Sequence, residues 1–205
     1  MNLSIADASP LAGSLLRLAQ SLQAQGYAFT TVTPATHARV NARPDAEVAR
    51  SLRDVFGWSR PFPSSLLEPR VLEWLRAADL LEAHADGLLR SAVRFSTLDG
   101  QLFAHSAYPT TAEDAVFFGP DTHRFVQLVT GELERRPLPA GGLILDICCG
   151  AGPGGILAAR AAAAADCKPR LVLGDINGRA LQFAAANAAH AGWGDAGLAQ
   201  GDLYG

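Results

Sequence analysis

The sequence has few cysteines, a single lysine and no long apolar run. Three cysteines, of which Cys148 and Cys149 are adjacent, cannot form a disulfide framework, so we expect a reducing, cytoplasmic location. No segment approaches the roughly 18 consecutive apolar residues of a membrane helix. The first residues also lack the basic start and apolar run of a secretion signal. These absences exclude a disulfide-stabilised secreted protein and predict no contact with a membrane.

Neither sign of charge dominates. The 205 residues include 17 basic and 20 acidic side chains, a formal net charge of −3, and 49% are hydrophobic. This composition is typical of a globular chain and gives no overall attraction for nucleic acid. Apart from Lys168, every basic residue is arginine, a bias that suggests a GC-rich bacterial coding sequence.

The pattern of residues 1–110 predicts helices followed by a β-hairpin. Apolar residues recur at helical spacing, Ser9-Pro10 is a helix start, and Leu98-Asp99-Gly100 is a hairpin turn signal. We expect helices over 10–26, 45–57 and around 71–80, and strands over 89–95 and 101–108. Because three helices and a hairpin are the elements of a winged-helix domain, we predict a winged-helix-like domain over residues 1–110.

From residue 140 strands and helices alternate. We expect strands over 143–148, 171–174 and 197–200, and helices over 156–165 and 179–191, with an earlier helix over about 121–136. A strand–helix–strand–helix–strand order is typical of a parallel sheet with helices on its faces. The sequence therefore predicts an α/β chain whose residues 111–205 form a partial Rossmann-like sheet.

A glycine-rich turn follows the first of these strands. Gly150 and Gly152 come after Asp146, and glycine permits both a sharp turn and the close approach of a ligand. The next helix directs free N–H groups towards the same place. Asp175 and Asp202 follow the second and third strands. Because parallel strands end at one edge, both carboxylates should line one crevice, with Asp175 towards ribose hydroxyls and Asp202 towards an adenine amino group.

Residues 145–152 resemble the Leu-Asp-x-x-x-Gly-x-Gly signature of class I S-adenosylmethionine-dependent methyltransferases. Within that class the chain resembles the "methyltransferase small" group, which includes release-factor glutamine and ribosomal-RNA guanine-N2 methyltransferases. Residues 118–122 are similar to its Pro-x-Pro-Glu-Thr segment and residues 201–204 to its Ser-Asp-Leu-Phe. Residues 175–181 are similar to its Asp-Ile-Asn-Pro-Arg-Ala-Leu, with Gly178 in place of proline.

This resemblance implies S-adenosyl-L-methionine as cofactor. Asp146 would lie near the methionine ammonium, Asp175 at the ribose and Asp202 at the adenine. The residues that the resemblance assigns to cofactor binding are Phe118, Pro120, Thr122, Asp146, Cys148, Gly150, Gly152, Asp175, Ile176, Asp202 and Leu203.

The implied reaction is methyl transfer to a planar nitrogen of a protein glutamine or of an RNA or DNA base, achieved largely by positioning. The group places its acceptor with an Asn-Pro-Pro-Tyr loop after a fourth strand. This sequence ends at Gly205 without that motif, so no catalytic residue is named and we expect the amino-terminal part of a longer enzyme. Without a fourth strand, strand 143–148 would be an exposed apolar edge, a predicted site of aggregation or self-association.

Other interpretations stay open. Gly150, Gly152 and Gly155 also have the spacing of a nicotinamide dinucleotide site, although Asp146 and Asp202 disfavour it. A non-catalytic winged-helix module with a vestigial cofactor domain is a further alternative. A less favoured interpretation of Asp146 is a buried carboxylate that only fixes backbone N–H groups.

Metal binding and RNA contact are further functions that residue types in this sequence can suggest, but the sequence pattern disfavours both. No cysteine or histidine pair has metal-ligand spacing, so no metal site is predicted. Thr122 and Asp121 can simply cap the helix beside them. Arg90 and Arg94 can touch RNA, but residues 1–110 contain ten arginines and ten acids, which favours a solvated face.

Overall fold

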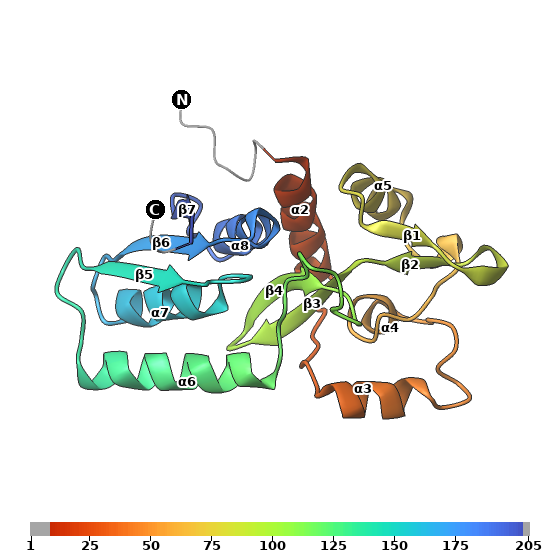
Figure 1. Cartoon of the computed structure of the whole chain (residues 1–205), viewed down its shortest axis with the longest axis horizontal. Coiled ribbons are helices and arrows are strands. Elements are labelled where there is room, and N and C mark those ends of the chain that lie inside the picture. The colour runs from red at the N-terminus through yellow and green to blue at the C-terminus, as the bar shows by residue number, and fades with distance from the viewer. Residues whose placement is uncertain (1–8, 203–205) are drawn as a thin grey trace.

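The computed structural model describes residues 9–202 and shows a mixed α/β fold (Figure 1). Within that range the helices are α2 (Pro10–Ala24), α3 (Pro34–Asn41), α4 (Leu52–Phe56), α5 (Pro69–Ala77), α6 (Pro120–Arg135), α7 (Pro153–Ala164) and α8 (Gly178–His190). The strands are β1 (Leu81–Ala83), β2 (Leu89–Ser91), β3 (Val93–Leu98), β4 (Gln101–Ser106), β5 (Leu143–Ile147), β6 (Arg170–Asp175) and β7 (Gly197–Gln200). They form the antiparallel pairs β1-β2 and β3-β4 and a parallel sheet of order β5-β6-β7.

The first predicted helix is confirmed. Ser9 caps α2 by accepting a hydrogen bond from the Ala12 N–H, and Pro10 stands in the first turn, where its missing N–H costs little. The predicted third helix corresponds to α5, which ends at Ala77.

The predicted second helix is wrong for most of its length, because only α4 is helical. Ser51 starts α4 by accepting a hydrogen bond from the Asp54 N–H. The chain before it consists of turns and bends, and the Ala49 N–H donates to the Pro61 carbonyl at 2.8 Å. Helix α3, which the sequence did not predict, begins after the cap Thr33.

The predicted hairpin is confirmed, but its first strand runs from Val93 to Leu98 rather than over 89–95, and its second strand ends at Ser106 rather than at 108. β3 pairs with β4 across the turn, with Leu98 opposite Gln101. The Ser91 hydroxyl donates to the Val93 carbonyl and accepts from the Val93 N–H, which bends the chain. β2 therefore pairs instead with β1, a strand that the sequence did not predict.

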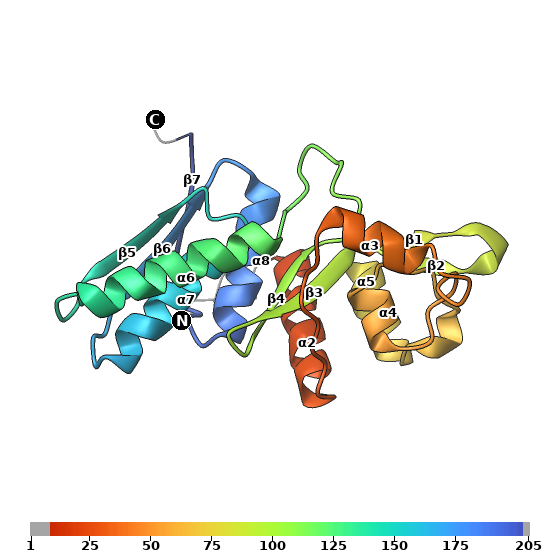
Figure 2. The same cartoon turned by 90° about the horizontal axis from the view of Figure 1, so that it is seen from below.

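The parallel sheet is confirmed, with helices on one face. Glycines of α7 lie against the sheet, since a Cβ added to Gly155 would meet Leu173 and Asp146. The α8 residue Ala184 and Leu173 both lie close to Gly152, so α7 and α8 cover the same side (Figure 2). Helix α6 packs outside α7.

The opposite face of β5 is open. Its alternate side chains are exposed, at 50% for Leu143, 56% for Leu145 and 53% for Ile147. In the sheet order β5 is an outer strand. Among the described residues, β5 is thus an outer strand with an open apolar face, which agrees with the exposed apolar edge that the sequence predicts.

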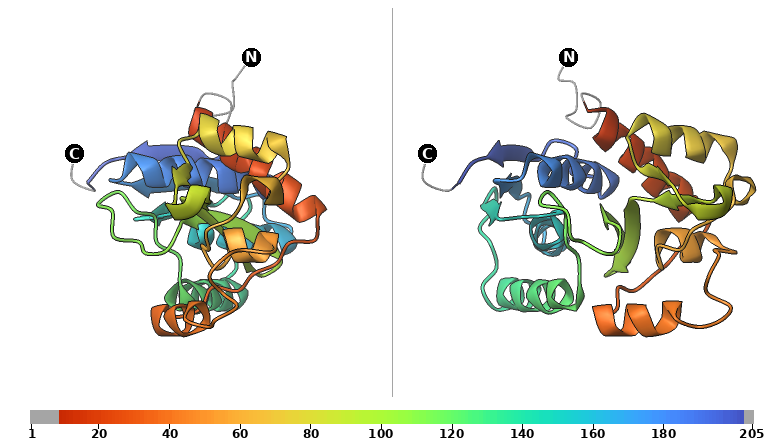
Figure 3. Two further views of the ribbon diagram at one scale, coloured as in Figure 1. Left: turned by 90° about the vertical axis from the view of Figure 1, so that its right-hand side faces the viewer. Right: turned by 45° about the vertical axis from the view of Figure 1, so that its right-hand side comes forward.

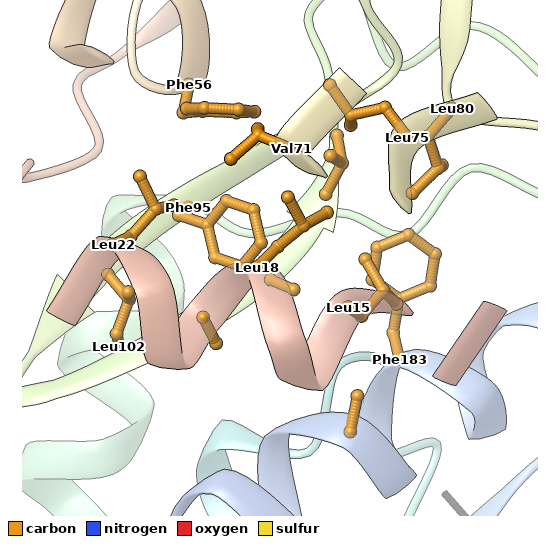
Figure 4. Close-up of a cluster of buried hydrophobic side chains, with 14 of the residues drawn as sticks. Leu15, Leu18, Leu22, Phe56, Val71, Leu75, Leu80, Phe95, Leu102 and Phe183 are labelled. Atoms are coloured by element: carbon orange, nitrogen blue, oxygen red, sulfur yellow. The ribbon is translucent and has the colours of Figure 1, made fainter. Parts of the chain in front are cut away.

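The larger core joins the two halves of the chain. It contains Leu15 and Leu18 of α2, Phe95 of β3 and Phe183 of α8 (Figure 4). Helix α2 consequently lies beside α8 (Figure 3), and the Ser9 hydroxyl donates to Gln182 at 2.6 Å. This core crosses the predicted boundary at residue 110. None of the helices between residues 9 and 202 is long and apolar enough to cross a membrane.

Candidate functional site

The glycine-rich turn between β5 and α7 has a left-handed backbone. Cys148, Gly150 and Gly152 have φ angles of 60°, 55° and 82°, a region that favours glycine. The Cys149 N–H donates to the Gly174 carbonyl at 2.9 Å and so ties the turn to β6. Gly152 then caps α7, with Pro153 as its first residue. The turn therefore brings the start of α7 to the carboxyl edge of the sheet.

Asp146 points under this turn, on the side of β5 that faces α7. Its Oδ2 accepts a hydrogen bond from the Gly155 N–H at 2.7 Å, which confirms the interpretation that this carboxylate fixes a backbone N–H. Burial raises the pKa of Asp146; the Gly155 N–H opposes this shift and the charge of Asp175 adds to it. Asp146 is therefore a partly buried carboxylate at the start of a helix.

Asp175 joins the glycine turn to the start of α8. Its Oδ2 accepts from the Gly150 N–H at 2.8 Å, and its Oδ1 accepts from the Asn177 N–H at 2.9 Å. Asn177 in turn caps α8 by accepting from the Arg179 N–H at 2.9 Å. The carboxylate is thus held by two backbone donors at the end of β6.

These groups surround one cavity of about 470 Å³. One wall is the glycine turn with the two carboxylates, and the other comes from residues 115–125 with Phe117, Thr122 and Phe125. Of the residues predicted for cofactor binding, the lining includes Thr122, Asp146, Cys148, Gly150 and Asp175.

The remaining predicted residues lie outside this lining. Pro120 opens α6, and Gly152 lies behind the turn, against Ile156 and Leu173. Ile176 is 68% exposed beside Asp175. Asp202 is exposed beyond β7, and Leu203 lies outside the described residues.

The two neighbouring residues Phe117 and Phe118 differ in exposure and in their position relative to the cavity. Phe118 is only 3% exposed and packs against His105 at 5.0 Å between ring centroids. Phe117 is 54% exposed and lines the cavity. Neighbouring side chains of an extended segment point to opposite sides, so only the Phe117 ring of this pair borders the cavity.

Thr122 has the expected capping role. Its hydroxyl accepts a hydrogen bond from the Gly119 N–H at 3.2 Å, and the same residue lines the cavity. Asp121, predicted as a cap, is exposed and also lines the cavity.

The interpretation of Arg90 and Arg94 as a solvated face is wrong. Arg94 is 4% exposed, donates from Nε to the Gly57 carbonyl at 2.9 Å and lies over the Phe29 ring. Arg90 donates to the Ser59 carbonyl at 3.1 Å. Both arginines therefore hold the loop after α4, Arg90 from β2 and Arg94 from the buried strand β3.

The cysteines of the turn differ in exposure. Cys148 is exposed towards the cavity, whereas burial raises the pKa of Cys149 to about 12. Between residues 9 and 202 no group of three or more His, Cys, Asp or Glu side chains is placed to hold a metal ion.

The site therefore offers two carboxylate acceptors, the half-exposed ring of Phe117, and a glycine-rich turn whose backbone a ligand can approach closely. Comparison of the sequence with protein-family models and with curated proteins gives no match. The function has to be argued from this geometry.

Proposed function

We propose that the chain binds S-adenosylmethionine in the cavity of about 470 Å³ and is the cofactor-binding part of an N-methyltransferase. The acceptor would be a planar amide or base nitrogen of a protein or an RNA. In this proposal residues 1–110 are a winged-helix-like region and residues 111–205 the first part of a Rossmann-like domain. The observation that carries the proposal is the Asp175 carboxylate, fixed by the Gly150 and Asn177 N–H groups beside the glycine turn.

The residues of the cavity suit the separate parts of such a ligand. Asp175 has lone pairs left for a pair of hydroxyl groups, as a ribose requires. Asp146 places negative charge where a ligand ammonium would be favoured. A Cβ added to Gly150 would meet no atom within 4 Å, so the turn leaves open space that a side chain would fill. Phe117 adds an apolar surface.

When bound, this cofactor supplies an electrophilic methyl group on a positively charged sulfur. The chain's own residues would bind and orient the ligand, which is how such enzymes gain most of their rate. Asp146 and Asp175 would contribute negative charge beside a cation. No described residue is assigned to the acceptor or to a catalytic proton transfer.

A nicotinamide dinucleotide is disfavoured by Asp146. A pyrophosphate would use the free N–H groups at the start of α7. The Gly155 N–H is already taken by Asp146 at 2.7 Å, and this carboxylate borders the cavity. A negative side chain at the start of α7 repels a phosphate and attracts a cation, so the same glycine spacing favours the sulfonium ligand.

Calorimetric titration with S-adenosylhomocysteine tests the proposal. Wild type should bind, and Asp175→Ala should weaken binding about 10-fold or more, since hydrogen bonds to a charged group contribute about 1.5–3 kcal/mol. Asp195→Ala, which removes an exposed carboxylate outside the cavity lining, is the matched control and should bind as wild type does.

Two results would contradict the proposal. One is the absence of binding at millimolar S-adenosylhomocysteine by a chain whose circular dichroism shows it folded, which favours a vestigial site. The other is tighter binding of NADH in a parallel titration, which favours the dinucleotide.

A further inference from the structure

Asn187 is a buried polar residue in the alanine-rich helix α8. Its side chain is 1% exposed, and its amide forms three hydrogen bonds to backbone atoms. Oδ1 accepts from the Ala104 N–H at 2.8 Å, and Nδ2 donates to the Ala104 carbonyl at 3.0 Å and to the Ala151 carbonyl at 2.8 Å. One amide therefore joins three segments that are distant in sequence.

On one side Asn187 completes the edge of the hairpin. Ala104 lies opposite Phe95 in the β3-β4 pair, and both of its backbone groups turn outward to the amide. In an antiparallel ladder such outward groups normally meet the next strand. The Asn187 side chain supplies the donor and the acceptor that a neighbouring strand would supply.

On the other side Asn187 holds the glycine turn. Ala151, whose carbonyl it binds, lines the cavity and stands between Gly150 and Gly152. Gly150 is itself tied to Asp175 at the end of β6. The turn is thus fixed at two points, to β6 through Asp175 and to α8 through Asn187, and Asn187 also fixes β4.

We infer that Asn187 is a positioning residue: it holds the glycine turn in the shape that lines the cavity and makes that shape depend on the β3-β4 hairpin. A buried amide costs free energy unless it is hydrogen-bonded, and alanine is the commonest residue elsewhere on α8. Because coupling between two sites is reciprocal, a ligand in the cavity should tighten β4, and a partner bound at the hairpin should alter affinity in the cavity. The nature of the ligand rests on the proposed function, but the mechanical link does not.

The first test needs no ligand. Hydrogen exchange is followed at single amides in wild type, Asn187→Asp and Gln182→Ala. Aspartate keeps the acceptor for the Ala104 N–H but loses both donors and faces two carbonyl oxygens. We expect the Gly150 and Gly152 amides to exchange at least about 10-fold faster in Asn187→Asp, while α5 is unchanged.

Gln182→Ala is the matched control. Gln182 lies on the same helix and also binds the amino-terminal half, through Ser9, but it does not touch the glycine turn. Its removal should leave exchange in the turn as in wild type. Equal acceleration in both variants, or none in Asn187→Asp, overturns the inference.

The second test separates a positioning role of Asn187 from a general loss of stability in the variant. Wild type is saturated with S-adenosylhomocysteine, and exchange of the Ala104 amide is measured; β4 is not part of the cavity lining. We expect slower exchange at Ala104 in wild type and a smaller slowing in Asn187→Asp. Unchanged exchange at Ala104 in saturated wild type overturns the coupling. This result needs wild type only, so it decides even if Asn187→Asp does not fold. If wild type binds no S-adenosylhomocysteine, the proposed function fails, and the ligand-free exchange still decides the role of Asn187.

Discussion

Gly155 lets α7 lie directly on the sheet. A Cβ added there would lie 2.7 Å from Leu173 Cδ2 and 2.9 Å from Asp146 Cβ, distances that force the helix or the strand to shift. We expect Gly155→Ala to lower the free energy of unfolding by about 1–3 kcal/mol, the usual cost of overpacking. Urea denaturation followed by circular dichroism measures the change.

Gly131 is the matched control for this substitution. It lies within α6, and an added Cβ would meet no atom within 4 Å. Gly131→Ala should therefore raise the free energy of unfolding by about 0.5–1 kcal/mol, because alanine restricts the unfolded chain. Destabilisation of similar size in both variants would contradict the packing argument.

Asp146 should make stability depend on pH. Burial raises its pKa above the ordinary 3.8. Between that value and the higher folded pKa, the folded chain keeps a proton that the unfolded chain has released. The contribution of Asp146 to the free energy of unfolding consequently falls as pH rises through this window.

Asp146→Asn removes this titration and keeps an oxygen that can accept from the Gly155 N–H. We expect the stability of the variant relative to wild type to increase with pH from below 3.8 towards neutrality and then level off. Denaturation at several pH values measures it, with Asp195→Asn as control. A difference that stays constant with pH would show that Asp146 has the same pKa in both states.

Single residues of the site were predictable where the strand ends are clear. Asp146 and Asp175 lie at the carboxyl ends of apolar strands, so their meeting at one edge follows from parallel topology. Phe117 could not be chosen over Phe118, because the extended segment carries no periodicity that fixes its faces. Asn187 has no local signal either, since its partner Ala104 lies 83 residues away.

At the scale of whole elements, the sequence predicts the alternating strands and helices well and the short amino-terminal elements poorly. β5, β6 and β7 are apolar runs between helices with clear ends. In the expected second helix, Val48 has the helical spacing but is 37% exposed, whereas Ala46 and Ala49 are buried. Contacts with distant segments, such as Ala49 with Pro61, override local periodicity there.

The open edge strand β5 should make the chain self-associate. Its outer side is unpaired among the described residues, and an unpaired apolar strand can pair with a second copy. Leu145→Lys places a charge in the middle of this edge, at a side chain that is 56% exposed. We expect the variant to remain monomeric at concentrations where wild type forms dimers or larger species, as measured by light scattering after gel filtration.

Val48→Lys is the control, because it replaces another exposed apolar residue far from the sheet. It should associate as wild type does, and both variants should keep the melting temperature within a few degrees, since surface changes are usually within about 0.5 kcal/mol. A monomeric wild type, or equal loss of association in both variants, would remove β5 as the pairing surface.

At the scale of the whole molecule, the contact between α2 and α8 joins the two halves of the chain. The predicted division into residues 1–110 and 111–205 follows the change in sequence pattern. The larger core nevertheless includes Leu15 and Phe95 together with Phe183. Local pattern shows where a new kind of sheet begins, but it does not show that two regions share one core, because that depends on which helix faces meet.

This shared core predicts cooperative unfolding of both halves. Trp74 packs against the larger cluster and Trp193 against the smaller one, so variants that keep only Trp74 or only Trp193 of the three tryptophans report on each half. We expect coincident urea transitions. Leu15→Ala, at a fully buried position, should destabilise both signals equally, by about 2–5 kcal/mol. A Trp193 transition that does not respond to Leu15→Ala would mean that the two regions unfold independently and that the α2–α8 contact contributes little to stability.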